Sequence, residues 1–91
     1  MAARVVDLEI IERDGERWFR FRWEGTSGDW GFALRALKAN VPPEAREFDE
    51  EAKLWSVVDV FEDELGEIFP NFAGSLDAIQ SQMNLFEEAA T

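Results

Sequence analysis

The side chains of this 91-residue chain that are able to do acid–base or metal chemistry are almost all carboxylates. The chain has 20 Asp and Glu residues but no histidine and no cysteine. It therefore lacks the commonest general base, the commonest metal ligand and any thiolate or disulfide site. The densest acidic run, DVFEDELGE at residues 59–67, lacks the loop pattern of a calcium site, and helical spacing spreads its carboxylates over a solvated face. Nothing marks two carboxylates as a catalytic pair. We expect no enzyme activity, no cofactor and no metal site.

The segment QMNLF, residues 82–86, has the pattern of a short adhesive peptide. It resembles the bacterial sliding-clamp-binding motif, which is a Gln, an aliphatic residue, a small polar residue and then Leu-Phe. Asn84 stands where Ser or Asp is usual in that motif. The resemblance implies that one side chain forms a hydrogen bond at the rim of an apolar cleft on the partner protein, and that three apolar side chains fill this cleft. The residues concerned are Gln82 at the rim and Met83, Leu85 and Phe86 in the cleft.

The same segment also fits the apolar stripe of a packed helix. If Ser75 caps a last helix, the apolar positions of that helix are Leu76, Ile79, Met83 and Phe86. Leu85 would lie beside this stripe. A position near the chain end favours a free peptide, whereas the regular spacing favours a core element. The sequence leaves both interpretations open.

Cationic and aromatic residues form a second candidate site, for nucleic acid. The net charge is −11, but residues 1–46 hold eight basic and eight acidic residues, and the whole excess falls in residues 47–91. The first half can therefore still approach a polyanion. The candidate residues for a single strand are Trp18, Arg20, Arg22, Arg35, Lys38 and Arg46. Trp55 is of the same type but occupies an inward position. Because the hairpin described next pairs Arg20 and Arg22 with acids, we expect weak binding or none.

The elements that position these side chains begin with a hairpin at residues 4–24. Asp14-Gly15 is a favoured two-residue turn, because glycine tolerates the positive φ of a type I′ turn. With this loop, the numbers of paired residues sum to 29. Ile10, Leu8 and Val6 then face Phe19, Phe21 and Trp23 on the core side. On the other side Glu9 faces Arg20, Asp7 faces Arg22, Ile11 faces Trp18 and Glu12 faces Arg17.

The rest of the chain predicts a helix, a second hairpin and two more helices. The first helix starts at a Ser27 or Asp29 cap and ends at Asn40, before two prolines. The hairpin covers residues 46–58 with a polar loop at 49–53. A helix at about 60–69 has Asp59 and Glu62 at capping-box spacing, and the last helix follows. The order ββαββαα indicates a single small α+β domain. Residues 1–72 are its body, and residues 73–91 are a C-terminal helix or a partner-binding tail.

The helix and hairpin at residues 30–58 carry a second resemblance. Its residues are Trp30, Phe32, Leu37, Lys38, Val41, Pro42, Arg46, Phe48, Asp49, Lys53, Trp55 and Val57. The pattern resembles the HARP domain of annealing helicases, and small bacterial and phage proteins with the same aromatic-Asp…Lys-x-Trp signature. The resemblance implies a helix–hairpin fold and a setting in DNA metabolism. In that family the module accompanies a helicase motor, and these 91 residues contain none, so annealing activity is not implied.

These features predict a small non-catalytic interaction module in DNA replication, repair or a mobile element. It would dock on a partner protein, and the sliding clamp is the candidate. One alternative is a weak single-stranded nucleic-acid-binding domain, and another is an acidic protein that occupies the site of a DNA-binding protein. No apolar run approaches the roughly 18 residues of a membrane span, and the start MAARVVDLEI has no signal-peptide core. We expect a cytoplasmic protein without a membrane segment.

Overall fold

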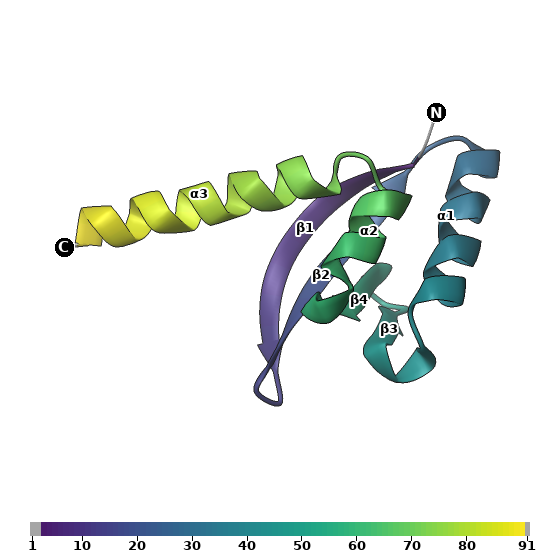
Figure 1. The fold of residues 1–91 in the computed structure, drawn as a ribbon, viewed down its shortest axis with the longest axis horizontal. Helices are drawn as coiled ribbons and strands as arrows, with labels where there is room; N and C mark the ends of the chain where they lie inside the picture. The colour runs from purple at the N-terminus through teal and green to yellow at the C-terminus, as the bar shows by residue number, and fades with distance from the viewer. Residues whose placement is uncertain (1–2, 91) are drawn as a thin grey trace.

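The computed structural model describes the backbone of residues 3–90 and the side chains of residues 3–81. It confirms the predicted α+β fold and the order ββαββαα (Figure 1). Two short 3₁₀ helices, η1 and η2, lie between the larger elements. The elements are β1 (Arg4–Arg13), β2 (Glu16–Glu24), α1 (Ser27–Asn40), η1 (Pro43–Ala45), β3 (Arg46–Asp49), β4 (Leu54–Val58), η2 (Asp59–Phe61), α2 (Glu62–Ile68) and α3 (Phe72–Ala90).

The two hairpins form one four-stranded antiparallel sheet in the order β1-β2-β4-β3. The long strand β2 pairs with the short strand β4, and the last pair between them is Phe21 with Trp55. β2 continues beyond this pair to Glu24, so Arg22, Trp23 and Glu24 have β1 beside them but no partner in β4. This difference in strand length leaves space at one end of the sheet.

The predicted turn of the first hairpin is confirmed. Asp14 and Gly15 have φ values of 54° and 79°, as a type I′ turn requires. Near the turn, the pairs run from Glu9 with Arg20 to Arg13 with Glu16, in the predicted register. The local chemistry of two turn residues therefore sets this half of the hairpin.

A β-bulge at Asp7 corrects the predicted register farther from the turn. Asp7 has a φ of 54°, and beyond it the pairing shifts by one residue, so that Val5 lies opposite Trp23 and Val6 opposite Arg22. An extra residue in one strand reverses the faces of the residues that follow it. Val5 is accordingly buried, at 3% exposure, and the prediction that Val6 faces Trp23 in the core is wrong.

Four phenylalanines join the sheet to the second half of the chain. The rings of Phe19 and Phe72 meet edge to face with centroids 5.2 Å apart, and those of Phe21 and Phe69 do so at 5.6 Å. All four side chains are buried. Each such pair contributes about 0.5–1.5 kcal/mol beyond the burial of its area. These contacts hold the end of α2 and the start of α3 on the sheet face that carries Phe19 and Phe21.

The predicted start of the first helix is corrected by one residue. The cap of α1 is Thr26, whose Oγ1 accepts a hydrogen bond of 3.2 Å from the backbone N–H of Asp29. The prediction named Ser27 or Asp29 as the cap. Thr26 has the extended backbone that a cap residue needs, whereas Ser27 is already helical. The predicted end is confirmed, since α1 ends at Asn40.

The starts of the last two helices also differ from the predictions. Residues 59–61 form η2, so α2 begins only at Glu62, and neither element has a side-chain cap from the predicted capping box at Asp59 and Glu62. α3 begins at Phe72 rather than at Ser75. The backbone N–H of Ser75 donates to the carbonyl of Asn71, so Ser75 already lies within the first helical turn.

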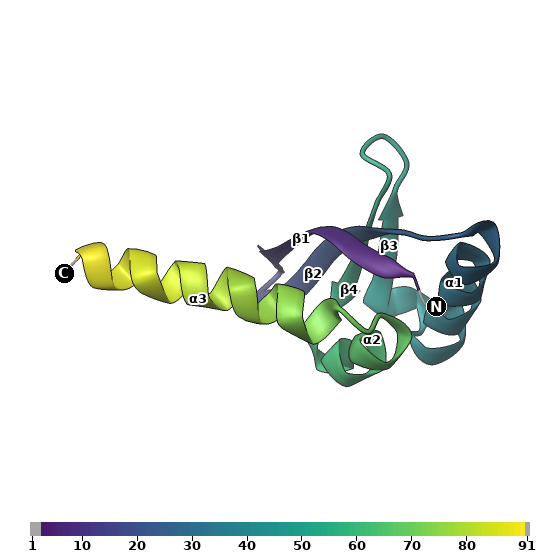
Figure 2. The same ribbon diagram turned by 90° about the horizontal axis from the view of Figure 1, so that it is seen from above.

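α3 begins against the sheet and runs away from it. Phe72 and Leu76 are buried, and Ile79 is half-buried. The yellow end of the helix, towards Ala90, extends beyond the sheet and the other helices (Figures 1 and 2). The predicted partner-binding side chains, Gln82, Met83, Leu85 and Phe86, lie outside the described side chains. Their backbone belongs to the far part of α3.

Candidate functional site

An aromatic pocket opens where β2 runs past the start of β4. Its volume is about 350 Å³, which is at the lower end of ligand pockets in proteins. Five parts of the fold contribute to it: β2, α1, β3, the loop after β3, and β4. The lining residues are Arg22, Trp23, Trp30, Phe48, Lys53 and Trp55.

Four aromatic rings follow one another along the pocket. The ring of Phe48 lies 5.0 Å from that of Trp55, which stacks on Trp23 at 6.2 Å, and Trp23 lies 5.3 Å from Trp30. Trp23 is also 5.1 Å from the buried ring of Phe69. The base of the pocket is therefore fixed to the core. The four rings thus form a continuous row from Phe48 on β3 to Trp30 on α1.

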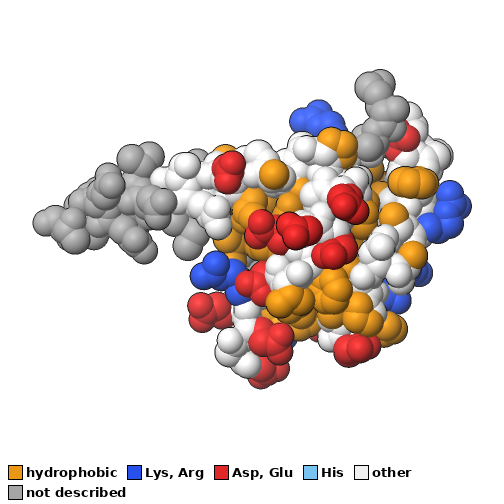
Figure 3. Space-filling view, in the orientation of Figure 1, with side chains coloured by type: hydrophobic (Ala, Val, Ile, Leu, Met, Phe, Trp, Pro, Cys, Tyr) orange, Lys and Arg blue, Asp and Glu red, His pale blue; other side chains and the backbone are white. Residues whose placement is uncertain are grey.

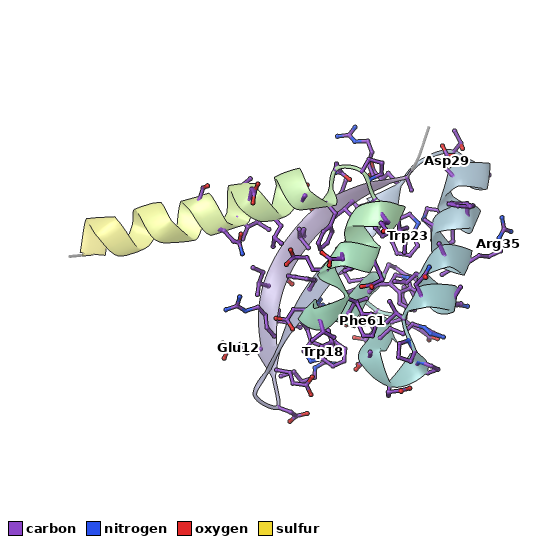
Figure 4. All side chains as sticks on the ribbon, in the orientation of Figure 1. Glu12, Trp18, Trp23, Asp29, Arg35 and Phe61 are labelled. Atoms are coloured by element: carbon purple, nitrogen blue, oxygen red, sulfur yellow. The ribbon has the colours of Figure 1, made fainter. Side chains whose placement is uncertain are left out.

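Local structure determines where each of these rings lies. Phe48 and Trp55 are cross-strand partners in the second hairpin, so their side chains emerge on the same face. The indole N–H of Trp23 donates to the backbone carbonyl of Trp30 at 3.4 Å, which ties the end of β2 to the first turn of α1. Trp23 lies between α2 and α1 in Figure 4. The helix and both hairpins thus converge at this point.

Asp49 shapes the loop that carries Lys53 to the pocket rim. Its Oδ1 accepts hydrogen bonds from the backbone N–H groups of Glu51 and Ala52, at 2.9 and 3.1 Å. The N–H of Lys53 then donates to the carbonyl of Asp49 at 2.8 Å, and Lys53 has a φ of 59°. Asp49 acts as the start of a tight turn, and Lys53 closes it in the left-handed region.

The pocket has a buried base and exposed walls. Trp23 is buried, whereas Trp30 is 42% and Phe48 is 39% exposed. Trp30 and Phe48 stand at the two ends of the aromatic row, and an exposed apolar surface that continues over several residues is typical of binding sites. Among the described residues that line the pocket, Lys53 and Arg22 are charged and none is acidic. The arrangement can bind a bulky apolar group with a negative charge next to it.

Arginines and acids cover the other face of the sheet, which we call the polar face and define by Glu9, Arg20, Arg22, Glu47 and Asp49. Arg20 lies 3.6 Å from Glu9 and 3.5 Å from Asp49. Its charge is shared between two carboxylates, one from each hairpin. The predicted pairing of Glu9 with Arg20 is confirmed.

Arg22 is neutralised in the same way. Its Nε donates to Asp7 Oδ2 at 2.6 Å, and its Nη1 to Glu24 Oε1 at 3.2 Å. These hydrogen bonds, the one donated to Asp7 first and then the one donated to Glu24, raise the pKa of the Arg22 guanidinium above its ordinary value. The predicted ion pair of Asp7 with Arg22 therefore forms although the bulge changes the backbone register. An arginine with two carboxylate partners adds little positive field.

Trp18 lies on this face too, but it is covered. It pairs across the strands with Ile11, as predicted, and is only 8% exposed. The guanidinium of Arg13 lies 4.9 Å above the centre of its ring, and Arg13 forms an ion pair with Glu47. Such a cation over an indole face is electrostatically favourable. The ring is therefore not available to stack on a base.

The structure does not bring the six predicted nucleic-acid residues together. Trp18, Arg20 and Arg22 belong to the polar face with acids beside them. Arg35 and Lys38 are exposed on α1, at the outer edge of the molecule, while acidic side chains gather over α2 (Figures 3 and 4). Arg46 donates to the carbonyl of Val41 at 3.4 Å.

Of the six pocket residues, Arg22 alone is among the predicted site residues, where it stands for nucleic-acid contact. The sequence pattern places Trp23 in the core and Phe48 and Lys53 in the second hairpin. The predicted loop at 49–53 would place Phe48 opposite Leu54. In the structure the loop covers residues 50–53, and Phe48 lies opposite Trp55. Four of the lining residues, Trp30, Phe48, Lys53 and Trp55, belong to the pattern at residues 30–58.

Comparison of the chain with protein-family models, with curated proteins and with solved structures finds no match. Within the described residues, no His, Cys, Asp or Glu side chains gather in a group of three or more able to hold a metal ion. In the same part of the chain, no helix combines the length and the hydrophobicity of a membrane span.

Proposed function

We propose that the chain is a non-catalytic interaction module that docks on a partner protein through the far end of α3. The candidate partner is the bacterial sliding clamp, and the setting is DNA replication, repair or a mobile element in the cytoplasm. The clamp follows from the resemblance of residues 82–86 to the clamp-binding motif. The DNA setting follows from the resemblance at residues 30–58.

The observation that supports this proposal is the course of α3. Phe72 and Leu76 anchor its first turns in the core, whereas the part that contains residues 82–86 extends beyond the sheet. A segment in this position can enter a cleft on another protein while the sheet and its core stay intact. Binding by a few apolar anchors is the usual energetic pattern for such short segments.

The test is binding of the full chain to a purified bacterial sliding clamp. The double variant Leu85→Ala with Phe86→Ala removes two of the three apolar anchors of the motif. We expect it to abolish clamp binding and to leave the melting temperature nearly unchanged. Isothermal calorimetry measures the first and a thermal melt followed by circular dichroism the second.

A matched control lies one turn earlier on the same helix. Gln80 and Ser81 are exposed on α3, so the double variant Gln80→Ala with Ser81→Ala should keep clamp binding. The proposal is wrong if the parent chain does not bind the clamp and the variant at Leu85 and Phe86 melts many degrees lower. In that case the segment belongs to the core, where losing one Phe costs about 3–5 kcal/mol.

A further inference from the structure

The aromatic pocket is a second binding feature, separate from the far end of α3 and independent of the proposal above. Its walls expose Trp30 and Phe48, while stacking on the buried Trp23 fixes Trp55. The volume of about 350 Å³ suits one bulky group rather than an extended ligand. The first requirement on an occupant is therefore a single large apolar or aromatic group.

The charge at the rim gives the second requirement. Arg22 already has two carboxylate partners, Asp7 and Glu24. Lys53 forms no ion pair with any side chain of the described part of the chain, and it lines the pocket. A ligand cation inside the aromatic row would meet this ammonium at the rim. A single anionic group is the complement that the site lacks.

The surroundings of the rim decide which class of molecule supplies that group. A nucleic-acid strand brings one negative charge with every phosphate, and Lys53 is the single unpaired cation among the described lining residues. Glu50 and Glu51 lie in the same loop as Lys53, and the whole chain carries a charge of −11. These acids repel every phosphate of a polyanion, whereas a peptide brings a single carboxylate that can pair with Lys53, so the repulsion it meets is much smaller.

From these contacts we infer that the pocket binds a peptide segment of another protein, which inserts an aromatic or large aliphatic side chain beside an Asp or Glu. The apolar side chain lies against Trp30, Trp55 and Phe48. The carboxylate next to it pairs with Lys53. Apolar contact supplies most of the affinity, and the ion pair selects acidic over basic segments.

Nuclear magnetic resonance of the indole N–H groups tests this site directly. The probe is a blocked tetrapeptide of the sequence glycine-tryptophan-glutamate-glycine, unlabelled, added to the ¹⁵N-labelled full chain. We expect saturable shifts of the indole signals of Trp30 and Trp55. The signal of Trp18 on the polar face should stay in place and serves as the internal control. In the variant Trp30→Ala, the signal of Trp55 should no longer shift when the peptide is added.

The rim charge is tested with a second peptide and a matched pair of variants. The peptide with lysine in place of glutamate should bind about two- to fivefold more weakly to the parent chain, as expected for one exposed ion pair. Lys53→Gln should remove this preference. Lys38→Gln, which changes an exposed lysine on α1 that does not line the pocket, should keep it.

Several results would overturn the inference. One is equal binding of the two peptides to the parent chain. Another is the absence of saturable shifts up to the solubility of the peptides. A third is a stronger response of the Trp30 and Trp55 signals to oligothymidylate than to the glutamate peptide, which would make the pocket a nucleic-acid site. None of these results depends on residues 82–86, so the clamp experiment can fail or succeed separately.

Discussion

The side chain of Asn71 is hydrogen-bonded to the backbone of Val5 in the way a neighbouring strand would be. The N–H of Val5 donates to Asn71 Oδ1 and Asn71 Nδ2 donates to the carbonyl of Val5, both at 2.9 Å. Val5 belongs to the edge strand β1, and Asn71 directly precedes α3. One amide thus satisfies two backbone groups of a sheet edge and fixes the start of α3 beside β1.

Removal of this amide should destabilise the fold measurably. Two partly buried hydrogen bonds, at about 0.5–1.5 kcal/mol each, predict a loss of about 1–3 kcal/mol for Asn71→Ala. Asn71→Asp keeps the acceptor for the N–H of Val5 but loses the donor to the carbonyl of Val5. Its free energy of unfolding should therefore also be lower than that of the parent chain. Urea unfolding measures both. Asn40→Ala, at the exposed C-terminus of α1, is the control and should cost less. A change below about 0.5 kcal/mol at Asn71 would show that the bonds are not important for stability.

The second prediction concerns Arg20, which joins the two hairpins. It lies 3.6 Å from Glu9 and 3.5 Å from Asp49, and all three side chains are at least partly exposed. A double-mutant cycle with Glu9→Gln and Arg20→Gln should give a favourable coupling of about 0.2–1 kcal/mol. The coupling should shrink as salt is raised, because exposed charges are screened. Zero coupling at low salt would contradict the claim that Arg20 is neutralised by these acids.

Local sequence chemistry accounts for much of the fold but not for the bulge. The Asp14-Gly15 turn has the residue types that its φ values demand, and the pairs beside it follow from that turn alone. The bulge at Asp7 is accompanied by contacts from far along the chain. Asn71 holds Val5, 66 residues away, and Val5 enters the core once the bulge has turned its side chain inward. Asp tolerates a left-handed backbone, but nothing nearby in the sequence requires one at residue 7.

The sequence predicts the elements that line the candidate pocket but not the contacts between them. The pairing of Phe48 with Trp55 lies within one hairpin, but it requires a loop at 50–53 rather than the predicted 49–53. Their contact with Trp23 requires β2 to lie beside β4, and a single sequence does not reveal strand order. The sequence does not predict that Trp30 is exposed either, because Trp30 shares an apolar stripe with Leu37, which is fully buried. Trp30 lies in the first turn of α1, at the N-terminal end of that stripe.

The third prediction compares the two loops that use a positive φ. At Lys53, where φ is 59°, a left-handed backbone costs an ordinary residue about 1–2 kcal/mol, and glycine avoids this at an entropic cost of about 0.5–1 kcal/mol. Lys53→Gly should therefore raise the free energy of unfolding by about 0.5–1 kcal/mol, while Lys53→Ala should leave it nearly unchanged. Gly15→Ala should lower it by about 1 kcal/mol. Denaturant melts of the three variants check the signs. If Lys53→Gly lowered the free energy of unfolding, the contacts of the Lys53 side chain would stabilise the fold by more than the relief of the left-handed backbone does.

The last prediction concerns nucleic acid. The first half of the chain carries no net charge, and the second half is strongly acidic. Arg20 and Arg22 on the polar face are already paired with carboxylates, so they add little to the release of counterions from a phosphate backbone. We expect no tight binding to duplex DNA at physiological salt and at most weak binding to a single strand. Arg35 and Lys38 are the exposed basic residues of α1, and Figure 4 shows Arg35 pointing away from the molecule. Fluorescence anisotropy with labelled oligothymidylate measures the affinity of the parent chain, of Arg35→Glu and of Lys38→Glu. Submicromolar binding by the parent chain that either variant abolishes would contradict this prediction and identify the outer side of α1 as a nucleic-acid surface. The pairing of the arginines on the polar face would then have no effect on nucleic-acid binding.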